Sequence, residues 1–319
     1  MTTQHSEPEH TVVVSDRQAA ADGVVALTVQ RADGGALPAW EPGAHVDLVL
    51  DAGLERQYSL CGDPAQADRW RLGILREPEG RGGSAFVHDK LAVGDTVTVR
   101  GPRNHFRLER APSYLFVAGG IGITPILAMI TRAHREGADW RLWYGGRRAE
   151  SMAFQEELAA YGDRVRFWPQ DVHGLLPLDD VLAGLDADTL VYSCGPEALL
   201  EAVEARAVGW PTGVLHLERF SPKEVGEPVR RSAFRVVCEQ SGVTVEVTPD
   251  RTILEALEAA GVFIDSSCRE GTCGTCETDV LGGHIEHRDS VLTPDEQAAG
   301  DRMMVCVSRA FGDELVLDL

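Results

Sequence analysis

Near the C-terminus the sequence reads Asp265-Ser266-Ser267-Cys268-Arg269-Glu270-Gly271-Thr272-Cys273-Gly274-Thr275-Cys276. Together with Cys306, its cysteines have the spacing C-x₄-C-x₂-C-x₂₉-C. This is the plant-type pattern in which four thiolates hold one [2Fe–2S] cluster. Gly271 and Gly274 permit the sharp turns that a loop wrapped around several sulfurs needs. Because the fourth cysteine is distant in sequence, a folded domain must bring it to the loop.

The same cysteines have two other interpretations, which fit the sequence less well. A structural zinc site usually pairs two C-x₂-C knuckles or adds histidines at short spacing, which the x₄ gap and the distant Cys306 do not match. Disulfide bonds are typical of short secreted chains, whereas this chain has 319 residues, 7 cysteines and no secretory signal. Of the remaining cysteines, Cys61 and Cys238 are interpreted as small buried hydrophobic residues.

Length and composition indicate a globular chain of two or three domains. With 319 residues, 44% of them hydrophobic, it can bury an ample core. Met1–His10 is polar, so no targeting segment is predicted. The longest apolar run, Leu115–Ile130, is interrupted by glycines and is too short to span a bilayer. We therefore expect a cytoplasmic protein that does not enter the membrane.

The chain is strongly acidic, and the acidity is unevenly placed. A net charge of −20 makes nucleic acid and anionic membranes poor partners. Ser232–Leu319 contains 17 Asp and Glu against 6 Lys and Arg, a net charge of −11. This excess fits two interpretations, which are plain solubility and a docking face that steers a basic redox partner.

Two breaks in composition divide the chain into segments of different periodicity. Residues 1–110 alternate apolar and polar residues in short runs between turns, which predicts a small antiparallel barrel. In residues 111–222 predicted strands alternate with helices such as Met152–Ala160, so we expect an open parallel sheet with helices on both faces. A polar, proline-punctuated linker follows at 223–232, and residues 233–319 are expected to form a compact α+β module. The predicted fold class is therefore multidomain, with β, α/β and α+β parts.

A glycine-rich turn, Gly119-Gly120-Ile121-Gly122-Ile123-Thr124-Pro125, lies between a predicted strand and a predicted helix at Pro125–Arg135. Glycines let the backbone approach a pyrophosphate, and the N-terminus of a helix supplies free N–H groups. Thr124 is expected to be the N-cap and Pro125 the first helical residue. Because the turn is not a G-x-G-x-x-G fingerprint, it is also compatible with a merely tight turn.

A second corner, Ser193-Cys194-Gly195-Pro196, follows the fourth strand of the same predicted sheet. Open parallel sheets bind ligands at the carboxyl ends of their strands. Two small-residue corners at that edge therefore favour a dinucleotide site. Taken alone, Cys194 is interpreted as a buried small residue.

The barrel offers a candidate flavin site. A nicotinamide gives up two electrons together and a [2Fe–2S] cluster takes one, so a flavin is needed between them. In Arg56-Gln57-Tyr58-Ser59-Leu60, strand alternation places Arg56, Tyr58 and Leu60 on one face. The aromatic ring can lie against the flavin while Arg56 reaches a phosphate. Without a flavin, Arg56 is interpreted as a residue that forms an ion pair on the barrel surface.

A further anion site is predicted at Gly80-Arg81-Gly82-Gly83-Ser84, which precedes the helical run Ala85–Leu91. Free N–H groups at the start of this helix would face a phosphate. The same turn is also compatible with a plain helix cap.

Taken together, these segments resemble the phthalate dioxygenase reductase family, which includes reductase components of aromatic-ring dioxygenases and of vanillate-type O-demethylases. The resemblance runs from about Thr11 to Leu319 and includes the order of the domains. The motifs that carry it are the cysteine loop, Arg56-Gln57-Tyr58-Ser59-Leu60, Gly80-Arg81-Gly82-Gly83-Ser84, Gly101-Pro102-Arg103-Asn104-His105-Phe106, Gly119-Gly120-Ile121-Gly122-Ile123-Thr124-Pro125, Cys194-Gly195-Pro196 and Cys306-Val307-Ser308-Arg309.

The resemblance implies a barrel that binds FMN rather than FAD, a parallel sheet that binds the nicotinamide and a β-grasp ferredoxin-like domain. The residues that it assigns to the flavin phosphate are Arg56, Ser59, Gly83 and Ser84, and those that it places along the flavin ring are Tyr58 and Leu60. It implies that Cys194 lies beside the nicotinamide. It also implies that Phe220 approaches the flavin, although Phe220 is equally compatible with an aromatic that packs the linker.

One region departs from the family pattern, because Gly145-Gly146-Arg147-Arg148 follows the second strand of the predicted sheet. Two arginines there could accommodate a 2′-phosphate and hence NADPH. Solvated arginines beside Glu150 are the alternative, and the family mostly uses NADH. We therefore expect NADH, with NADPH as the second choice.

The resemblance implies a reductase that passes electrons from NADH through FMN to the cluster and on to a separate oxygenase. The expected partner is a Rieske-type aromatic oxygenase or O-demethylase, and the alternative partner is a haem-thiolate monooxygenase. A cluster-based redox sensor and a zinc-stabilised interaction protein are more distant alternatives. A monomer would suit a mobile electron donor.

Overall fold

The computed structural model describes residues 8–50 and 54–319. Within these ranges the chain forms two compact units that meet in sequence between Glu218 and Arg219. The first unit contains the expected barrel and the expected parallel sheet, and the second contains the expected linker and α+β module. The finer boundaries at 110, 222 and 232 stay a prediction. No helix of the described ranges is long and apolar enough to cross a membrane.

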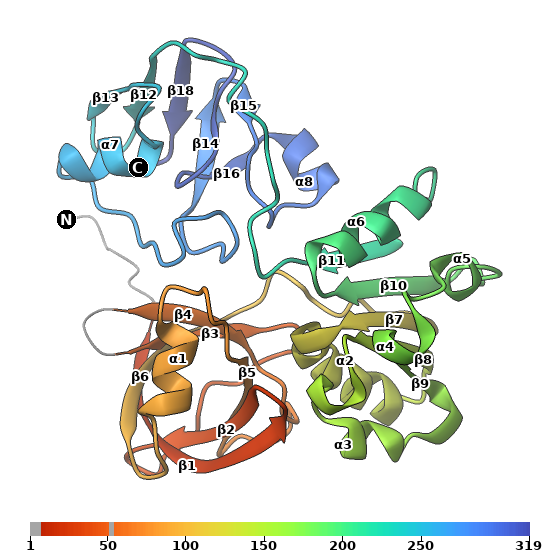
Figure 1. Cartoon of the computed structure of the whole chain (residues 1–319). Helices are drawn as coiled ribbons and strands as arrows, with labels where there is room; N and C mark the ends of the chain where they lie inside the picture. The colour runs from red at the N-terminus through yellow and green to blue at the C-terminus, as the bar shows by residue number, and fades with distance from the viewer. Residues whose placement is uncertain (1–7, 51–53) are drawn as a thin grey trace. The chain divides into compact units, whose positions relative to one another are not determined.

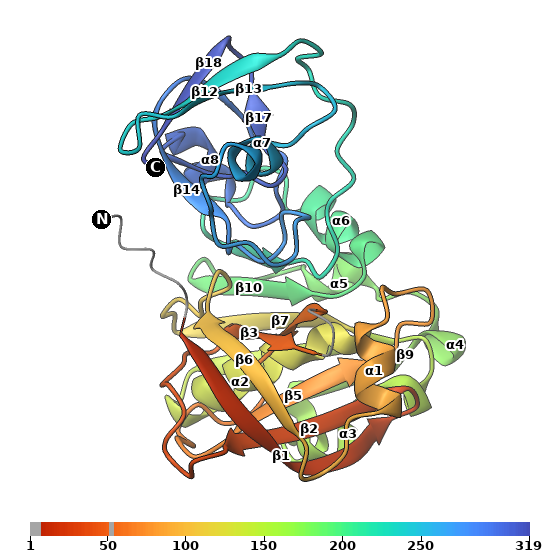
Figure 2. The same cartoon turned by 90° about the vertical axis from the view of Figure 1, so that its left-hand side faces the viewer.

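The N-terminal sheet is an antiparallel barrel with the strand order β4-β3-β6-β1-β2-β5 (Figure 1). Its strands are β1 (Glu9–Ala21), β2 (Val24–Arg31), β3 (His45–Val49), β4 (Glu55–Ser59), β5 (Trp70–Leu75) and β6 (Thr96–Arg103). An antiparallel bridge between Leu60 and Leu72 joins the two ends of the sheet. Alternate residues such as Leu27 and Val29 are fully buried inside, as the period of two predicts. Helix α1 (Gly83–Asp89) lies beside the barrel (Figure 2).

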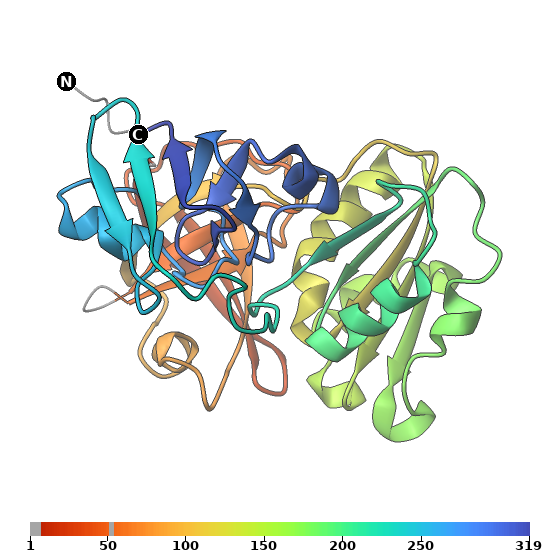
Figure 3. The ribbon, with the colours of Figure 1, turned by 90° about the horizontal axis from the view of Figure 1, so that it is seen from above.

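The second sheet is fully parallel and has the strand order β11-β10-β7-β8-β9. Its strands are β7 (Ser113–Gly119), β8 (Asp139–Gly146), β9 (Val165–Pro169), β10 (Thr189–Cys194) and β11 (Leu215–Glu218). Its helices are α2 (Ile123–Arg135), α3 (Gln155–Ala159), α4 (Gln170–His173), α5 (Leu178–Val181) and α6 (Glu197–Arg206). They cover both faces of the sheet (Figure 3). Strand β7 is therefore buried on both sides, and its sequence is a continuous apolar run.

The start of α2 differs from the expectation. The helix begins at Ile123, directly after a 3-10 turn, η2 (Gly120–Gly122), so Thr124 is not its N-cap and Pro125 is not its first residue. Thr124 lies in the first turn, and its hydroxyl donates a hydrogen bond to the Ile121 carbonyl at 2.9 Å. The helix starts early because the left-handed backbone of Gly120 (φ 54°) already turns the chain.

The helix predicted at Met152–Ala160 is also shorter in the structure. Helix α3 covers only Gln155–Ala159, and a 3-10 turn, η3 (Ala149–Ser151), precedes it. The interruption is at Phe154, whose φ of 63° is incompatible with a right-handed helix.

The second unit is built on a mixed sheet with the strand order β13-β12-β18-β14-β16. Its strands are β12 (Phe234–Cys238), β13 (Thr244–Val247), β14 (Glu277–Gly282), β16 (Arg302–Met304) and β18 (Glu314–Leu317), and β15 (Ile285–Glu286) pairs separately with β17 (Arg309–Ala310). Strands β12 and β18 are parallel, and the other pairs are antiparallel. Helix α7 (Ile253–Ala259) starts with a capping box between Thr252 and Glu255, and α8 (Pro294–Ala299) was not predicted.

Candidate functional site

The four predicted ligand cysteines come together in the second unit. Cys268, Cys273 and Cys276 lie on the loop between α7 and β14, and Cys306 follows β16. All are free thiols and at most 4% exposed. The backbone N–H groups of Glu270 and Thr272 donate to the Cys268 sulfur at 3.3 and 3.4 Å. Inward N–H donors of this kind stabilise thiolates and tune an iron–sulfur cluster, so the loop fits the group that its spacing predicts.

Glycine is required at both turns of this loop. Gly271 and Gly274 have φ angles of 73° and 75°, which favour glycine. A Cβ at Gly271 would also lie 2.6 Å from a methyl carbon of Val307, the residue after Cys306. The absent side chain therefore lets the segment of the fourth cysteine approach the loop.

Asp289 lies in a segment that contacts the cysteine loop, and it was not identified from the sequence. Its buried carboxylate accepts hydrogen bonds from the backbone N–H groups of Val291 and Leu292, and the neighbouring Ser290 N–H donates to the Gly271 carbonyl at 2.9 Å. Burial by itself raises the pKa of Asp289, but hydrogen bonds from His287 and from these N–H groups outweigh it and lower the pKa. The segment therefore holds a charged carboxylate next to Gly271 of the cysteine loop.

Two of the predicted flavin-binding segments meet in the barrel. The Arg56 guanidinium donates to the Arg81 carbonyl at 2.8 Å, and a Cβ at Gly83 would lie 2.4 Å from Arg56 Cγ. Arg56 on β4 therefore packs against the start of α1. Ser84 is buried, and its hydroxyl accepts a hydrogen bond from the Glu77 N–H at 2.9 Å. The pairing brings a cation and a glycine-rich helix start into one place.

The other residues of the Arg56–Leu60 motif differ in burial. Tyr58 is partly buried at the edge of the barrel core, and burial raises its pKa to about 12. Ser59 is almost fully buried opposite His45, and Leu60 belongs to the barrel core itself. The side chain of Leu60 thus lies among core residues rather than at an exposed surface.

The two glycine corners of the parallel sheet are in direct contact. A Cβ at Gly122 would lie 2.3 Å from the Cys194 carbonyl oxygen and 2.6 Å from the Gly195 nitrogen. A Cβ at Gly119 would likewise lie 2.7 Å from the Pro196 ring. The absence of side chains lets the backbones of both corners approach each other at the carboxyl edge, where open sheets bind ligands.

Two polar side chains near these corners were not identified from the sequence. Tyr144 on β8 is fully buried, and its hydroxyl donates to the Gly120 carbonyl at 3.1 Å, which holds the first corner in place. The hydroxyl of Ser193 is fully buried and has no hydrogen-bond partner among the described residues. A buried hydroxyl without a partner is costly, so the second corner has a donor available for a ligand.

Cys194 forms a pair with Glu218 on the neighbouring strand. The two residues are register partners in β10 and β11, and the Cys194 sulfur lies 3.9 Å from a Glu218 carboxyl oxygen. Burial raises the pKa of Glu218 to about 8 and also raises the pKa of the Cys194 thiol. At neutral pH the pair is therefore predominantly protonated. Adjacent parallel strands could have suggested this contact from the sequence, but only with the register known.

Three other candidate residues lie on the surface. Phe220 is 44% exposed and belongs to the second unit. Arg147 and Arg148 are exposed at the end of β8, and a long ion pair of 3.9 Å joins Arg148 to Asp22. Solvent screens such a pair, so Arg148 is held only weakly.

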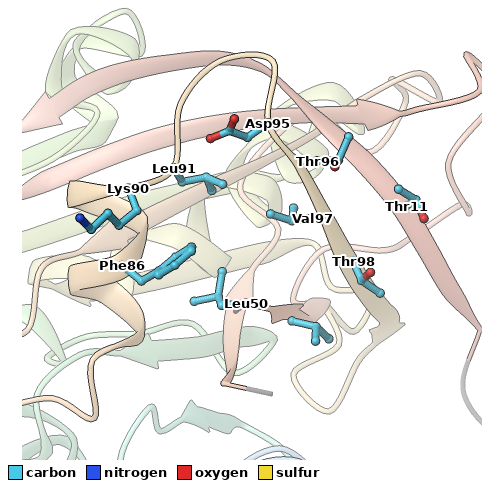
Figure 4. A pocket seen from close by; sticks show the side chains of 10 residues that line it. Thr11, Leu50, Phe86, Lys90, Leu91, Asp95, Thr96, Val97 and Thr98 are labelled. Atoms are coloured by element: carbon cyan, nitrogen blue, oxygen red, sulfur yellow. The ribbon is translucent and has the colours of Figure 1, made fainter. Parts of the chain in front are cut away.

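A cavity of 540 Å³ lies elsewhere on the barrel (Figure 4). Its walls come from β1, β3, α1 and β6, with Phe86, Lys90 and Asp95 at its rim. None of the residues predicted to bind a cofactor lines this cavity. It therefore takes no part in the candidate site.

The pair of Cys194 and Glu218 predicts a pH dependence of stability. The pKa of Glu218 is raised from 4.5 to about 8 in the folded chain, so stability relative to Glu218→Gln falls as the pH rises between these values. We expect the difference in unfolding free energy to change by at least about 1.4 kcal/mol, the value of one pKa unit. Urea denaturation at about pH 5 and pH 8 measures it. Glu201→Gln, on the exposed face of α6, is the control, and identical behaviour of both variants would contradict the prediction.

Comparison with known proteins supports both units. Residues 236–311 match the 2Fe-2S iron-sulfur cluster binding domain, and residues 116–205 match the oxidoreductase NAD-binding domain. The chain is 44% identical to phenoxybenzoate dioxygenase subunit beta from Ectopseudomonas oleovorans, over 94% of each chain. It is 37% identical to phthalate dioxygenase reductase from Burkholderia cepacia, over 100% of each chain.

Solved structures show the same architecture. Phthalate dioxygenase reductase is similar with a TM-score of 0.71 at 37% identity, and 98% of each chain is covered. An intact type IV self-sufficient cytochrome P450 monooxygenase is similar with a TM-score of 0.92 at 44% identity. All of this chain, but only 43% of that longer one, is covered. The chain belongs to the phthalate dioxygenase reductase family, whose members are NAD(P)H-dependent flavin and iron–sulfur reductases of oxygenase systems.

Proposed function

We propose that this reductase uses NADH and FMN and that it supplies single electrons to a Rieske-type oxygenase or O-demethylase. The observation that carries the proposal is the backbone contact between Gly122 and Cys194, because it would suit a dinucleotide site in the same chain as the four buried cysteines. FMN would take up a hydride from NADH and release its electrons singly. The protein supplies binding, orientation and insulation from water.

The anion site of the barrel supports FMN rather than FAD, because it is suited to a phosphate at the end of the cofactor. Arg56 and the turn at Gly82 and Gly83 would hold one terminal phosphate, with the α1 N–H groups and Ser84 beside it. Tyr58, partly buried at the barrel edge, would lie along the flavin ring. As the family resemblance implies, Ser59 would contribute to the phosphate. Leu60 would line the flavin ring with its backbone, because its side chain lies in the barrel core.

The nucleotide would bind at the paired corners. Gly119, Gly120 and Gly122 would let the pyrophosphate approach the backbone before α2, with Thr124 and Pro125 in its first turn. Cys194, followed by Gly195 and Pro196, would lie beside the nicotinamide, with the protonated Glu218 behind it. For Phe220, the approach to the flavin that the family resemblance implies stays a prediction.

NADH is favoured over NADPH by the surroundings of Arg147 and Arg148. Both side chains are exposed, and Arg148 already faces Asp22 across 3.9 Å. A dedicated 2′-phosphate site would hold its arginines in a fixed geometry, because bidentate contacts need a preorganised guanidinium.

A Rieske-type partner is supported by relatives that cover at least 94% of this chain, which are named as parts of dioxygenase, monooxygenase and O-demethylase systems. A haem-thiolate monooxygenase is the second candidate. The P450 monooxygenase structure favours it, because there a segment with a TM-score of 0.92 to this chain is part of the same polypeptide as a P450. The acidic second unit would suit a basic docking face on either partner. We also propose a cytoplasmic monomer with no nucleic-acid or membrane partner.

Release of the flavin by acid tests the cofactor. We expect chromatography of the supernatant to show FMN. We expect a separate, untreated sample of the oxidised chain to bleach with NADH at far lower concentrations than with NADPH. Release of FAD, or an equal response to the two nucleotides, would contradict the cofactor assignment.

Gly122→Ala tests the paired corners. Its new methyl group would collide with the Cys194 carbonyl and force the corners apart. We expect the Kd for NADH to rise at least about tenfold, which corresponds to about 1.4 kcal/mol. The dependence of the rate of flavin bleaching on NADH concentration measures it. Gly312→Ala, whose Cβ meets nothing within 4 Å and whose backbone is not left-handed, is the control. Unchanged affinity in Gly122→Ala would place the nucleotide elsewhere.

Cys273→Ser tests the order of the carriers. Loss of one thiolate should remove the cluster while the first unit still accepts a hydride from NADH. We therefore expect flavin bleaching at the wild-type rate and loss of cytochrome c reduction. Cys238→Ser is the matched control, because Cys238 is buried in the same unit outside the loop. Normal cytochrome c reduction by Cys273→Ser would show that the cluster is not the outlet.

A further inference from the structure

Strand β5 of the barrel touches the glycine-rich turn of the parallel sheet through Gly73. A Cβ at Gly73 would lie 2.7 Å from Thr124 Cγ2 and 3.1 Å from the ring of Phe154. Gly73 and Thr124 are both buried. The barrel and the sheet are therefore in van der Waals contact at the turn that the proposed function assigns to the pyrophosphate.

Phe154 adopts an uncommon backbone conformation at this contact. Its φ of 63° is left-handed, which is disfavoured for a bulky side chain unless the surroundings hold it. The ring lies against Gly73 on one side, and the Arg71 guanidinium lies 5.0 Å from its centroid. This is the geometry of a cation–π contact. The conformation of Phe154 is thus held by residues of the barrel.

Arg71 connects three segments of the first unit. Its two terminal nitrogens lie 2.9 and 3.1 Å from the two carboxyl oxygens of Glu157 on α3, so the ion pair is two-pronged. One of these nitrogens also donates to the Cys61 carbonyl at 2.7 Å. Cys61 directly follows the Arg56–Leu60 motif. Arg71 therefore ties the end of the flavin motif to the helix that follows Phe154.

We propose that Arg71, Phe154 and Glu157 are positioning residues that fix the nicotinamide-binding sheet against the flavin barrel and thereby set the rate of hydride transfer. The proposal rests on the proposed function, because it concerns transfer from NADH to the flavin. None of the three belongs to the predicted cofactor-binding residues. Phe154 and Thr124 both pack against Gly73, so the three residues act on the glycine-rich turn through this contact.

The ion pair is suited to orientation more than to stability. The side chains of Arg71 and Glu157 are 28% and 41% exposed, so water screens their attraction. Two parallel hydrogen bonds nevertheless fix the angle between β5 and α3. Hydride transfer needs the reacting rings in contact, and a shift of about 1 Å can cost about a hundredfold in rate.

Other contacts hold the barrel and the sheet together when this ion pair is removed. Arg135 on α2 pairs with Asp63 at 2.6 Å, and the Asp22 N–H donates to the Glu150 carbonyl at 2.8 Å. Removal of the Glu157 carboxylate should therefore loosen one contact between the barrel and the parallel sheet without separating them. This makes Glu157 a suitable position for the test.

The test compares Glu157→Ala with Glu156→Ala in the intact chain with flavin and cluster bound. Glu156 is the preceding residue on the same helix, is exposed, and forms no ion pair among the described residues. For Glu157→Ala we expect the rate of flavin reduction at saturating NADH to fall at least about tenfold, the Kd for NADH to stay within twofold, and flavin content to be normal. Stopped-flow absorbance measures the rate, and Glu156→Ala should match the wild type.

Hydrogen exchange supplies a readout that does not depend on turnover. Glu157→Ala should exchange faster than Glu156→Ala in the peptides that contain Gly73 and Thr124, because the packing around Gly73 loosens when the ion pair between Arg71 and Glu157 is lost. Gly73→Ala, which pushes Thr124 and Phe154 away without changing a charge, should also slow hydride transfer.

The outcomes separate this inference from the proposed function. If the wild-type flavin is not reduced by NADH, the proposed function fails. If it is reduced, and Glu157→Ala has the wild-type rate and exchange, the positioning role is wrong. Loss of bound flavin from Glu157→Ala would also overturn it, because the role would then be to retain the cofactor.

Discussion

The constraint on which the rest of this structure depends is a mismatch in electron number. A reduced pyridine nucleotide gives up two electrons as a hydride, whereas a [2Fe–2S] cluster takes one at a time. A flavin can take two and release them singly, so it must lie between them. Each group needs different surroundings, and the chain supplies an antiparallel barrel, a parallel sheet and a mixed sheet to provide them. The three-part architecture follows from this chemistry.

Glycine is required for different reasons at the proposed nucleotide site and at the cysteine loop. Gly122 has an ordinary backbone conformation, and it is required for space, because the Cys194 carbonyl occupies the place of its Cβ. Gly271 is required for space and for its left-handed backbone, since the turn must aim N–H groups at a sulfur while Val307 packs behind it. Close backbone approach therefore occurs at the proposed nucleotide site in one unit and at the cysteine loop in the other.

The sequence predicted features that depend on spacing and periodicity, and it missed those that depend on register or on single dihedral angles. The cysteine spacing predicted the clustered thiols, and parallel-sheet topology predicted that the corners at Gly122 and Cys194 share an edge. The pairing of Cys194 with Glu218 needs the register of β10 and β11, which no local pattern encodes. The N-cap predicted at Thr124 was wrong because a 3-10 turn begins the helix earlier. The left-handed Phe154 had no signal in the sequence.

Rapid anaerobic mixing of the oxidised chain with NADH, with flavin absorbance and the cluster's paramagnetic signal followed together, shows whether electrons reach the cluster through the flavin. We expect the flavin to bleach first and the cluster signal to rise afterwards, and we expect no such rise in chain that is stripped of flavin but still carries its cluster. A cluster signal that grows at an undiminished rate in flavin-free chain would contradict this expectation.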